Sequence, residues 1–436
     1  MSRDIIKPSI LPGFMELIPS EQILFNKMMD TIRENYEKFG FLPIDTPVIE
    51  KAEVLLAKGG GETEQQIYRF EKGDTDLALR FDLTVPLARY VAQHFSELTF
   101  PFRRYHIGKV YRGEKAQRGR FREFYQCDID IIGNGTLDVI NDAEIPSIIY
   151  STFKDLGFDS FTIKINNRKV LKGFFQWLGI DDSTEILRSV DKLEKIGLDG
   201  VIKELEEQGL EKSVIDKILE FIQIKGTNEE KLNSLESLKI ENETFNEGLE
   251  ELKAINHYVG LFGVPESNYS IDLTIARGLD YYTGTVYETF LNDYPHIGSI
   301  CSGGRYDNLA EYYTKQKLPG VGISIGLTRL FYQLNEAKLI EVEDNSLTKA
   351  IIIPMEGYLE KAVEIGKILR DNNINTQVYL EKAKMGKKFG FADKLNIPYA
   401  IIIGAEEVKE NKYTLRNMKT GEQTMLSIED ILSSLK

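Results

Sequence analysis

The stretch from Tyr105 to Asp130 restricts most strongly what this chain can fold into, because it reads as two strands joined by a basic loop. Successive side chains of a strand point to opposite faces. The polar face of the second run carries Arg120, Arg122, Phe124, Gln126, Asp128 and Asp130. The opposite face is apolar and predicts a core. The polar row predicts a site that holds a phosphate, a flat ring and an amine in that order.

The basic loop and the residues that flank it carry a local positive charge within an acidic chain. Between Arg103 and Arg122 there are eight Lys or Arg residues and one acidic residue, whereas the whole chain has a formal net charge of −14. A local basic footprint can bind phosphate in an acidic protein. We therefore expect a bound anion here. From these residues alone, a solvent-exposed hairpin with surface ion pairs stays the alternative.

Composition narrows the class of protein. A chain of 436 residues exceeds the size at which one hydrophobic core stops growing, so two or three domains are expected. Cys127 and Cys301 form no CxxC pair and the four histidines form no HExxH motif, so neither a disulfide framework nor a zinc site is expected. No apolar run is long enough to cross a bilayer, which predicts a cytoplasmic protein without a membrane partner.

The first hundred residues predict a helix and an edge strand. Apolar residues at helical spacing indicate a helix from Ser20 to Phe39, and the following strand contains Pro43 and Pro47, which favours a sheet edge. Further on, Asp82 and Thr84 end a strand just before a helix. Their side chains either point into a pocket or cap that helix, and the sequence favours neither.

The later part of the chain changes pattern twice. Charged amphipathic helices from about residue 165 to 265 lack strand signals and indicate a helical insertion within a domain that spans 1–345. Strands then alternate with helices over 346–436, which predicts a small α/β domain. The overall class is therefore α+β. Exposed lysines of one helix in the last domain are usually solvated, but they are also a candidate RNA patch, formed by Lys384, Lys387 and Lys388.

Arg329 occupies an unusual position. It falls in the first turn of a helix that begins near Leu327, where the helix dipole disfavours a cation. A bound anion would be attracted by both the guanidinium group and the helix N-terminus. An ion pair with a nearby carboxylate is the alternative.

Together these segments resemble the histidyl-tRNA synthetase family of class II aminoacyl-tRNA synthetases. The segment ending at Pro47 resembles the first class II motif, YRGEKAQRGRFREFYQ the second and GVGISIGLTRL the third, while RGLDYYTGTVYE from Arg277 resembles the histidine-specific signature. The resemblance covers essentially the whole chain. It implies an antiparallel catalytic sheet flanked by helices, a helical insertion, a C-terminal anticodon-binding domain and a homodimer.

The resemblance also implies a binding site for ATP. Its residues would be Arg112, Glu114, Arg120, Arg122, Phe124 and Arg329. Arg112 would hold the α-phosphate, Glu114 the adenine amino group and Phe124 the adenine ring. Arg329 would hold the terminal phosphates. Mg²⁺ on the departing pyrophosphate is expected, with ligands that the sequence does not identify and no protein metal site assigned.

The histidine site follows from the same resemblance. It would comprise Asp82, Thr84, Gln126, Asp130, Arg277, Tyr281 and Tyr282. Gln126, Asp82 and Thr84 would bind the amino and carboxylate end, and Asp130 with Tyr282 the imidazole. Catalytic roles would fall to Arg112, Gln126 and Arg277. Arg277 would lie between the histidine carboxylate and the α-phosphate, where a fixed cation aids adenylation.

The implied partner is tRNA-His, whose 3′ end would receive histidine from histidyl-adenylate. Contacts to the acceptor end would come from Lys115, Gln117 and Arg118 in the basic loop. Two other functions compete. A regulatory subunit of ATP phosphoribosyltransferase shares this fold but typically lacks the anticodon domain. A synthetase for glycine, proline or threonine would share the generic motifs, but RGLDYYTG and Asp130 argue against it.

Overall fold

A computed structural model describes residues 6–57, 65–115, 119–190, 192–275, 282–340 and 346–436. The chain divides into two compact units. The first comprises Met1–Glu16 and Phe25–Ile340, and the second Leu17–Leu24 and Glu341–Lys436. Within the described ranges, no helix is both long and apolar enough to cross a membrane.

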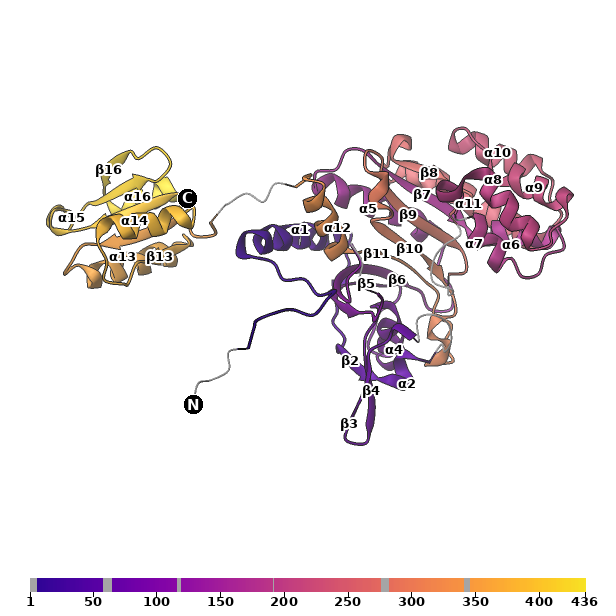
Figure 1. Cartoon of the computed structure of the whole chain (residues 1–436), viewed down its shortest axis with the longest axis horizontal. Helices are drawn as coiled ribbons and strands as arrows, with labels where there is room; N and C mark the ends of the chain where they lie inside the picture. Colours follow the sequence, from indigo (N-terminus) through magenta and orange to yellow (C-terminus); the bar gives the residue numbers. More distant parts are fainter. Residues whose placement is uncertain (1–5, 58–64, 116–118, 191, 276–281, 341–345) are drawn as a thin grey trace. The chain divides into compact units, whose positions relative to one another are not determined.

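The first unit is built on one large sheet, to which eight strands of the described residues belong (Figure 1). In spatial order they are β1 (Leu42–Pro43), β5 (Phe102–Tyr111), β6 (Glu123–Ile132), β11 (Gly320–Ile325), β10 (Cys301–Tyr306), β9 (Thr285–Leu291), β7 (Phe161–Asn167) and β8 (Tyr269–Ile271). The pairs from β5 to β7 are antiparallel, and β1 and β8 add parallel strands at the two edges. The predicted α+β class with a large, mainly antiparallel sheet flanked by helices is confirmed, and the proline-containing segment does lie at a sheet edge.

Helices and a smaller sheet surround this framework (Figure 1). The helices are α1 (Pro19–Lys38), α2 (Ala52–Leu55), α4 (Thr84–Gln93), α5 (Ile140–Asp155) and α12 (Leu327–Glu336), and the second sheet has the order β2 (Ile49–Lys51), β4 (Thr75–Leu79), β3 (Arg69–Lys72). Cys127, Ile129 and Ile131 of β6 are fully buried, as the alternation predicted. The hydroxyl of Tyr36 donates to the carbonyl oxygen of Cys127 at 2.9 Å and joins α1 to this strand. One face of β6 therefore belongs to the core.

The helical segment follows β7 directly and packs beside the β7–β8 edge (Figure 1). Its helices are α6 (Arg168–Trp177), α7 (Thr184–Val190), α8 (Leu193–Glu207), α9 (Lys212–Ile222), α10 (Asn228–Ser237) and α11 (Glu243–Leu261). The expected start near residue 165 falls inside β7, so the helices begin three residues later. Gly173 and Gly248 let α6 and α11 approach closely, because a Cβ atom at Gly173 would lie 2.3 Å from the backbone nitrogen of Phe245.

The second unit contains a mixed sheet with the order β13 (Thr376–Val378), β12 (Ala350–Pro354), β14 (Tyr399–Ile403), β15 (Tyr413–Asn417), β16 (Gln423–Leu426). Its helices are α13 (Leu359–Asp371), α14 (Met385–Lys394), α15 (Ala405–Glu410) and α16 (Ile428–Leu435). Strands β12 to β14 pair in parallel, and Ile351 and Ile352, which face opposite sides of β12, are both buried. Burial on both faces accounts for the unbroken apolar runs of the sequence.

Candidate active site

The central hairpin is formed as predicted. Strands β5 and β6 pair over ten residues each, from Phe102 opposite Ile132 to Tyr111 opposite Glu123. Strand β6 lies between β5 and β11 in the large sheet, so its polar side chains project from the interior of the sheet and not from an edge.

Not every cation of the basic stretch needs an external anion. Arg103 pairs with Glu144 of α5 at 2.8 Å, and Lys109 pairs with Glu123 at 2.7 Å. Arg104 is fully buried and forms an ion pair with Asp130. These acidic partners lie outside residues 103–122, so the charge of that stretch alone overstates the positive charge available to a ligand.

A cavity of about 560 Å³ lies on the polar face of β6. Ten of the predicted site residues line it: Asp82, Thr84, Arg112, Glu114, Arg120, Phe124, Gln126, Asp130, Tyr282 and Arg329. They come from the start of α4, the central hairpin, the segment before β9 and α12. Arg277, Tyr281, Gln117 and Arg118 were also predicted but lie outside the described residues.

Three arginines of the described residues line the cavity, and one of them lies over an aromatic ring. The guanidinium carbon of Arg112 lies 5.2 Å from the centre of the Phe124 ring, and Arg112 Nε donates to the carbonyl oxygen of Phe81 at 3.0 Å. Arg329 lies in the first turn of α12 and donates to the carbonyl oxygen of Ile297 at 3.0 Å. Burial and then the positive charge of Arg120 lower the pKa of Arg329. Like charges held this close at a helix N-terminus favour an anionic ligand.

Two predicted contacts need correction. Arg122 does not line the cavity, because its Nε folds back and donates to the carbonyl oxygen of Glu114 at 3.0 Å. Lys388 is buried in the second unit, where its ammonium donates to the carbonyl oxygen of Pro354 at 2.7 Å. Lys115, Lys384 and Lys387 are exposed. The basic helix α14 thus offers fewer cations than its sequence indicates.

Asp82 fulfils both readings of its sequence position. Its Oδ1 accepts a hydrogen bond from the backbone nitrogen of Val85 at 3.0 Å and so caps α4, while its Oδ2 has no hydrogen-bond partner among the described residues. Burial raises the pKa of this carboxyl group to about 6. The helix cap holds the carboxylate rigidly, and the second oxygen stays available to a ligand.

Asp130 is buried at the same face of β6 and is more fully bonded than the sequence indicated. It pairs with Arg104 and accepts a hydrogen bond from the hydroxyl of Tyr306 at 2.6 Å. Burial raises its pKa to about 6, although the charge of Arg104 opposes this shift. Gly322 makes room for it, because a Cβ atom there would lie 2.3 Å from Asp130 Oδ1. Tyr306 was not predicted as a site residue. The alternation of side chains along β10, after Gly303 and Gly304, was the signal that could have placed it toward the cavity.

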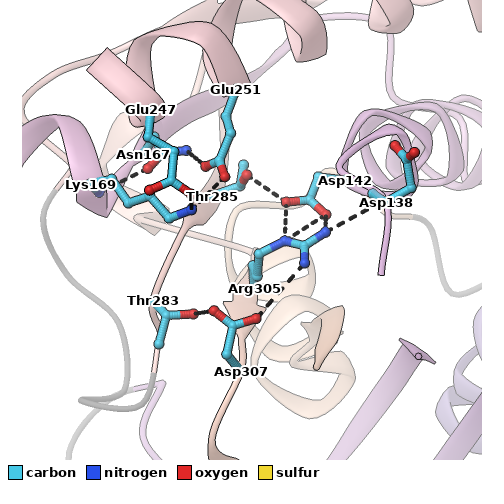
Figure 2. A network of polar contacts seen from close by, with 10 residues as sticks. All are labelled: Asp138, Asp142, Asn167, Lys169, Glu247, Glu251, Thr283, Thr285, Arg305 and Asp307. Carbon is cyan, nitrogen blue, oxygen red and sulfur yellow. Dashed lines mark hydrogen bonds and ion pairs between the residues drawn. The ribbon is translucent and has the colours of Figure 1, made fainter. Parts of the chain in front are cut away.

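A separate polar network lies near the same sheet, outside the residues that line the cavity (Figure 2). Arg305 of β10 pairs with Asp142 of α5 at 2.6 Å, and Thr285 Oγ1 donates to Asp142 at 2.6 Å. On the other side, Thr283 Oγ1 donates to Asp307 at 2.6 Å. The network therefore fixes Thr283 and Thr285, which belong to the second half of the predicted histidine signature.

Figure 2 also shows how the helical segment joins this region. Asn167 at the end of β7 donates to Glu251 of α11 at 2.6 Å, and Lys169 of α6 donates to Glu251 at 2.5 Å and to Glu247 at 2.7 Å. The backbone nitrogen of Arg168 donates to the carbonyl oxygen of Gly284 at 2.8 Å. The first helix of the segment is thus hydrogen-bonded to Gly284, a residue of the signature directly before β9.

Comparison with known proteins agrees with this geometry. The family model for histidyl-tRNA synthetase matches residues 13–330, which is more than half of the chain. The chain belongs to the histidyl-tRNA synthetase family. The model for the anticodon binding domain matches residues 349–436.

Relatives of known name extend over the full length of this family member. The histidine–tRNA ligase of Clostridium tetani is 67% identical, with all of both chains covered. The crystal structure of histidyl-tRNA synthetase from Nostoc sp. PCC 7120 has a TM-score of 0.90 and 41% identity, covering 99% of each chain. A Bacillus halodurans structure titled ATP phosphoribosyltransferase regulatory subunit/histidyl-tRNA synthetase has a TM-score of 0.76, covers 91% of this chain and 99% of its own, and at 20% identity shares the fold alone.

Proposed function

We propose that the cavity forms histidyl-adenylate from L-histidine and ATP, and that the chain then transfers histidine to the 3′ end of tRNA-His. The observation that carries this proposal is the order of groups along one face of β6. Arginines and Phe124 lie toward one end of the row, and Gln126 and Asp130 toward the other, all within one cavity. Membership of the histidyl-tRNA synthetase family supports the same activity.

The reaction requires alignment and charge stabilisation rather than acid–base chemistry. A carboxylate oxygen of histidine attacks the α-phosphorus, an O–P bond forms, and the bond to pyrophosphate breaks with the electron pair leaving on pyrophosphate. Fixed cations that face the developing charge lower this barrier. Arg112 would hold the α-phosphate, with Arg120 and Arg329 on the terminal phosphates. Phe124 would stack on adenine and Glu114 would accept from its amino group.

The amino acid would lie beyond the α-phosphate. Gln126, Asp82 and Thr84 would hold its amino and carboxylate end, and Arg277 would bridge the carboxylate and the α-phosphate. Asp130 and Tyr282 would recognise the imidazole. Because Arg104 and Tyr306 already bond to Asp130, that carboxylate is held in one orientation.

The proposal also includes a metal ion, tRNA and a second copy of the chain. Mg²⁺ bound to ATP would offset the charge of the departing pyrophosphate. Among the described residues no group of three or more His, Cys, Asp or Glu side chains could hold a metal ion. Exposed Lys115 would approach the acceptor end of tRNA, and Lys384 and Lys387 its anticodon stem. The chain would act in the cytoplasm as a homodimer, and the apolar side chain of Leu42, 61% exposed on edge strand β1, would contribute to the dimer interface.

Pyrophosphate exchange into ATP tests the function directly. Purified protein should exchange pyrophosphate with histidine and with no other standard amino acid. Equal exchange with glycine, proline or threonine would indicate another class II synthetase, and no exchange with any amino acid would indicate a regulatory subunit.

A substitution of Arg277 tests the proposed mechanism. Arg277→Ala should lower the adenylation rate well over tenfold, because a contact to transition-state charge is typically worth several kcal/mol. Its thermal unfolding should match that of the unsubstituted protein. An unchanged rate would remove Arg277 from the mechanism.

A further inference from the structure

The polar face of β6 contains one carboxylate to which the proposed mechanism gives no role. Asp128 lies between Gln126 and Asp130 on that face, is 2% exposed and lines the cavity. Its Oδ1 has no hydrogen-bond partner among the described residues. A buried acceptor without a partner costs about 1–3 kcal/mol, and more when it is charged. A binding site can retain such a group because the ligand satisfies it.

Two more buried acceptors of the same cavity lack partners within the described part of the chain. They are Oδ2 of Asp82 and Oε1 of Gln126. The negative charge of Asp82 contributes to the raised pKa of Asp128, so the two carboxylates interact electrostatically. Three oxygen atoms from residues that line one cavity, two on β6 and one just before α4, thus have no donor among the described residues.

Ser324 of β11 holds part of this arrangement in place. Gln126 Nε2 donates to Ser324 Oγ at 2.8 Å, and the hydroxyl of Ser324 is hydrogen-bonded to the Asp128 carboxylate. Strand register explains the contact, because Ser324 lies directly opposite Asp128. Since the amide nitrogen of Gln126 is engaged by Ser324, its oxygen is the group left for a ligand.

Charge indicates what that ligand is. Asp130 is neutralised by Arg104, whereas Asp82 and Asp128 form none of the ion pairs observed among the described residues. Two carboxylates and an amide oxygen suit a cation with several N–H donors. A primary ammonium group provides three.

We propose that Asp128 is a further substrate-binding residue, which accepts a hydrogen bond from the α-ammonium group of the amino acid alongside Asp82 and Gln126. This inference rests on the proposed function and adds Asp128 to its amino-acid site. Asp128 thereby selects substrates that carry a free α-ammonium group.

A ligand that lacks the ammonium group separates this role from a structural one. L-Histidine and 3-(imidazol-4-yl)propionate differ only in the α-ammonium, and their affinities for the unsubstituted protein and for Asp128→Asn can be measured by calorimetry. Histidine should bind the variant 10- to 100-fold more weakly, because a charge-assisted hydrogen bond is lost. Imidazolylpropionate should bind both proteins within twofold. The KM for ATP should not change.

Two controls complete the experiment. Asp155→Asn removes a partly exposed carboxylate that bonds to Lys38 at 2.7 Å, and it should leave both affinities unchanged. Ser324→Ala keeps the Asp128 charge but removes its orienting hydroxyl, and it should weaken histidine binding three- to tenfold without affecting imidazolylpropionate. This second variant also tests the role if Asp128→Asn fails to fold.

Each outcome bears on a different claim. Equal weakening of both ligands in Asp128→Asn would mean that Asp128 acts on the imidazole or on the fold, and unchanged affinity for histidine would mean that it makes no contact. Either result overturns the inference while histidine-dependent exchange by the unsubstituted protein still supports the proposed function. No histidine-dependent exchange in the unsubstituted protein would overturn the proposed function itself.

Discussion

Asp128 lies in strand β6 of the large sheet and Asp142 in helix α5, and both carboxylates are buried, yet their surroundings differ. Asp142 is 0% exposed and both of its oxygen atoms are bonded, to Arg305 and to Thr285. Asp128 is 2% exposed and one of its oxygen atoms has no partner within the described ranges. The closed arrangement serves the fold. The open one keeps an acceptor ready for a ligand.

The raised pKa values alone do not separate these two carboxylates. Burial is the largest cause of the upward shift for Asp142 and for Asp128 alike, and hydrogen bonds from Arg305 and from Ser324 oppose it. Geometry makes the distinction. The guanidinium group of Arg305 donates to both oxygen atoms of Asp142 at 2.6 to 3.1 Å. This bidentate arrangement leaves no space for a substrate.

The largest effect is expected at the closed network. Asp142→Ala leaves the buried guanidinium group of Arg305 without its main partner, and breaking such a pair costs about 3–5 kcal/mol. Urea unfolding should show this loss in the free energy of unfolding, with or without histidine. The exposed Asp159→Ala serves as the control. A loss below about 1 kcal/mol would contradict the structural role of the network.

The phosphate end of the cavity should respond next. Arg329→Ala should raise the KM for ATP at least tenfold, which corresponds to about 1.4 kcal/mol, because a cation at a helix N-terminus is lost from the proposed phosphate site. Histidine affinity measured without ATP should stay within twofold. An equal weakening of ATP and histidine binding would show that the phosphate end and the amino-acid end of the cavity do not act separately.

Acid pH sharpens the comparison further. Burial raises the pKa of Asp128 to about 7, against an ordinary value of 3.8, and the charged groups around it are Arg104, Asp130 and Asp82. The folded protein thus binds this proton more tightly than the unfolded chain does. The contribution of Asp128 to stability is full below pH 4 and is lost as the pH rises through 7.

Asp128→Asn should therefore flatten the dependence of stability on pH between 5 and 7.5 when no ligand is bound. Thermal unfolding across that range measures the slope. The same slope in the variant and in the unsubstituted protein would show that Asp128 does not titrate there.

The smallest effect is expected at the surface. Lys38 pairs with Asp155 at 2.7 Å, but more than 40% of each side chain is exposed. Lys38→Ala should change the free energy of unfolding by less than about 1 kcal/mol. A larger loss in urea unfolding would show that ion pairs stabilise this protein even outside its buried networks.

Local patterns predicted the parts of the site that depend on local geometry. Alternation along β6 placed Phe124, Gln126 and Asp130 on one face, and the apolar pattern with its first-turn arginine placed Arg329 at the start of α12. The same alternation predicted wrongly that Arg122 faces the cavity. The chain bends just before β6, and the Arg122 side chain bonds to the carbonyl oxygen of Glu114 in the loop.

Partners from distant segments could not be predicted in this way. Arg104 was only one of the eight cations that together predicted a bound anion, whereas in the fold it pairs with Asp130. Lys388 was predicted to belong to an exposed basic patch, whereas its ammonium group is buried and bonds to Pro354. Tyr306 reaches Asp130 only because β10 lies two strands from β6. These contacts depend on the order of strands in the sheet and on the direction of each side chain, and neither can be predicted from one segment of the sequence alone.

The most direct test of the distinction between closed and open carboxylates is the urea unfolding of Asp128→Asn with and without saturating histidine. Without histidine the variant should be at least as stable as the unsubstituted protein at pH 7.5, because a buried charge is removed whose Oδ1 has no hydrogen-bond partner among the described residues. With histidine at the same concentration it should gain less stability than the unsubstituted protein gains, because the stabilisation by a ligand rises with the logarithm of its concentration divided by its Kd. A loss of several kcal/mol without histidine, as expected for Asp142→Ala, would contradict the account.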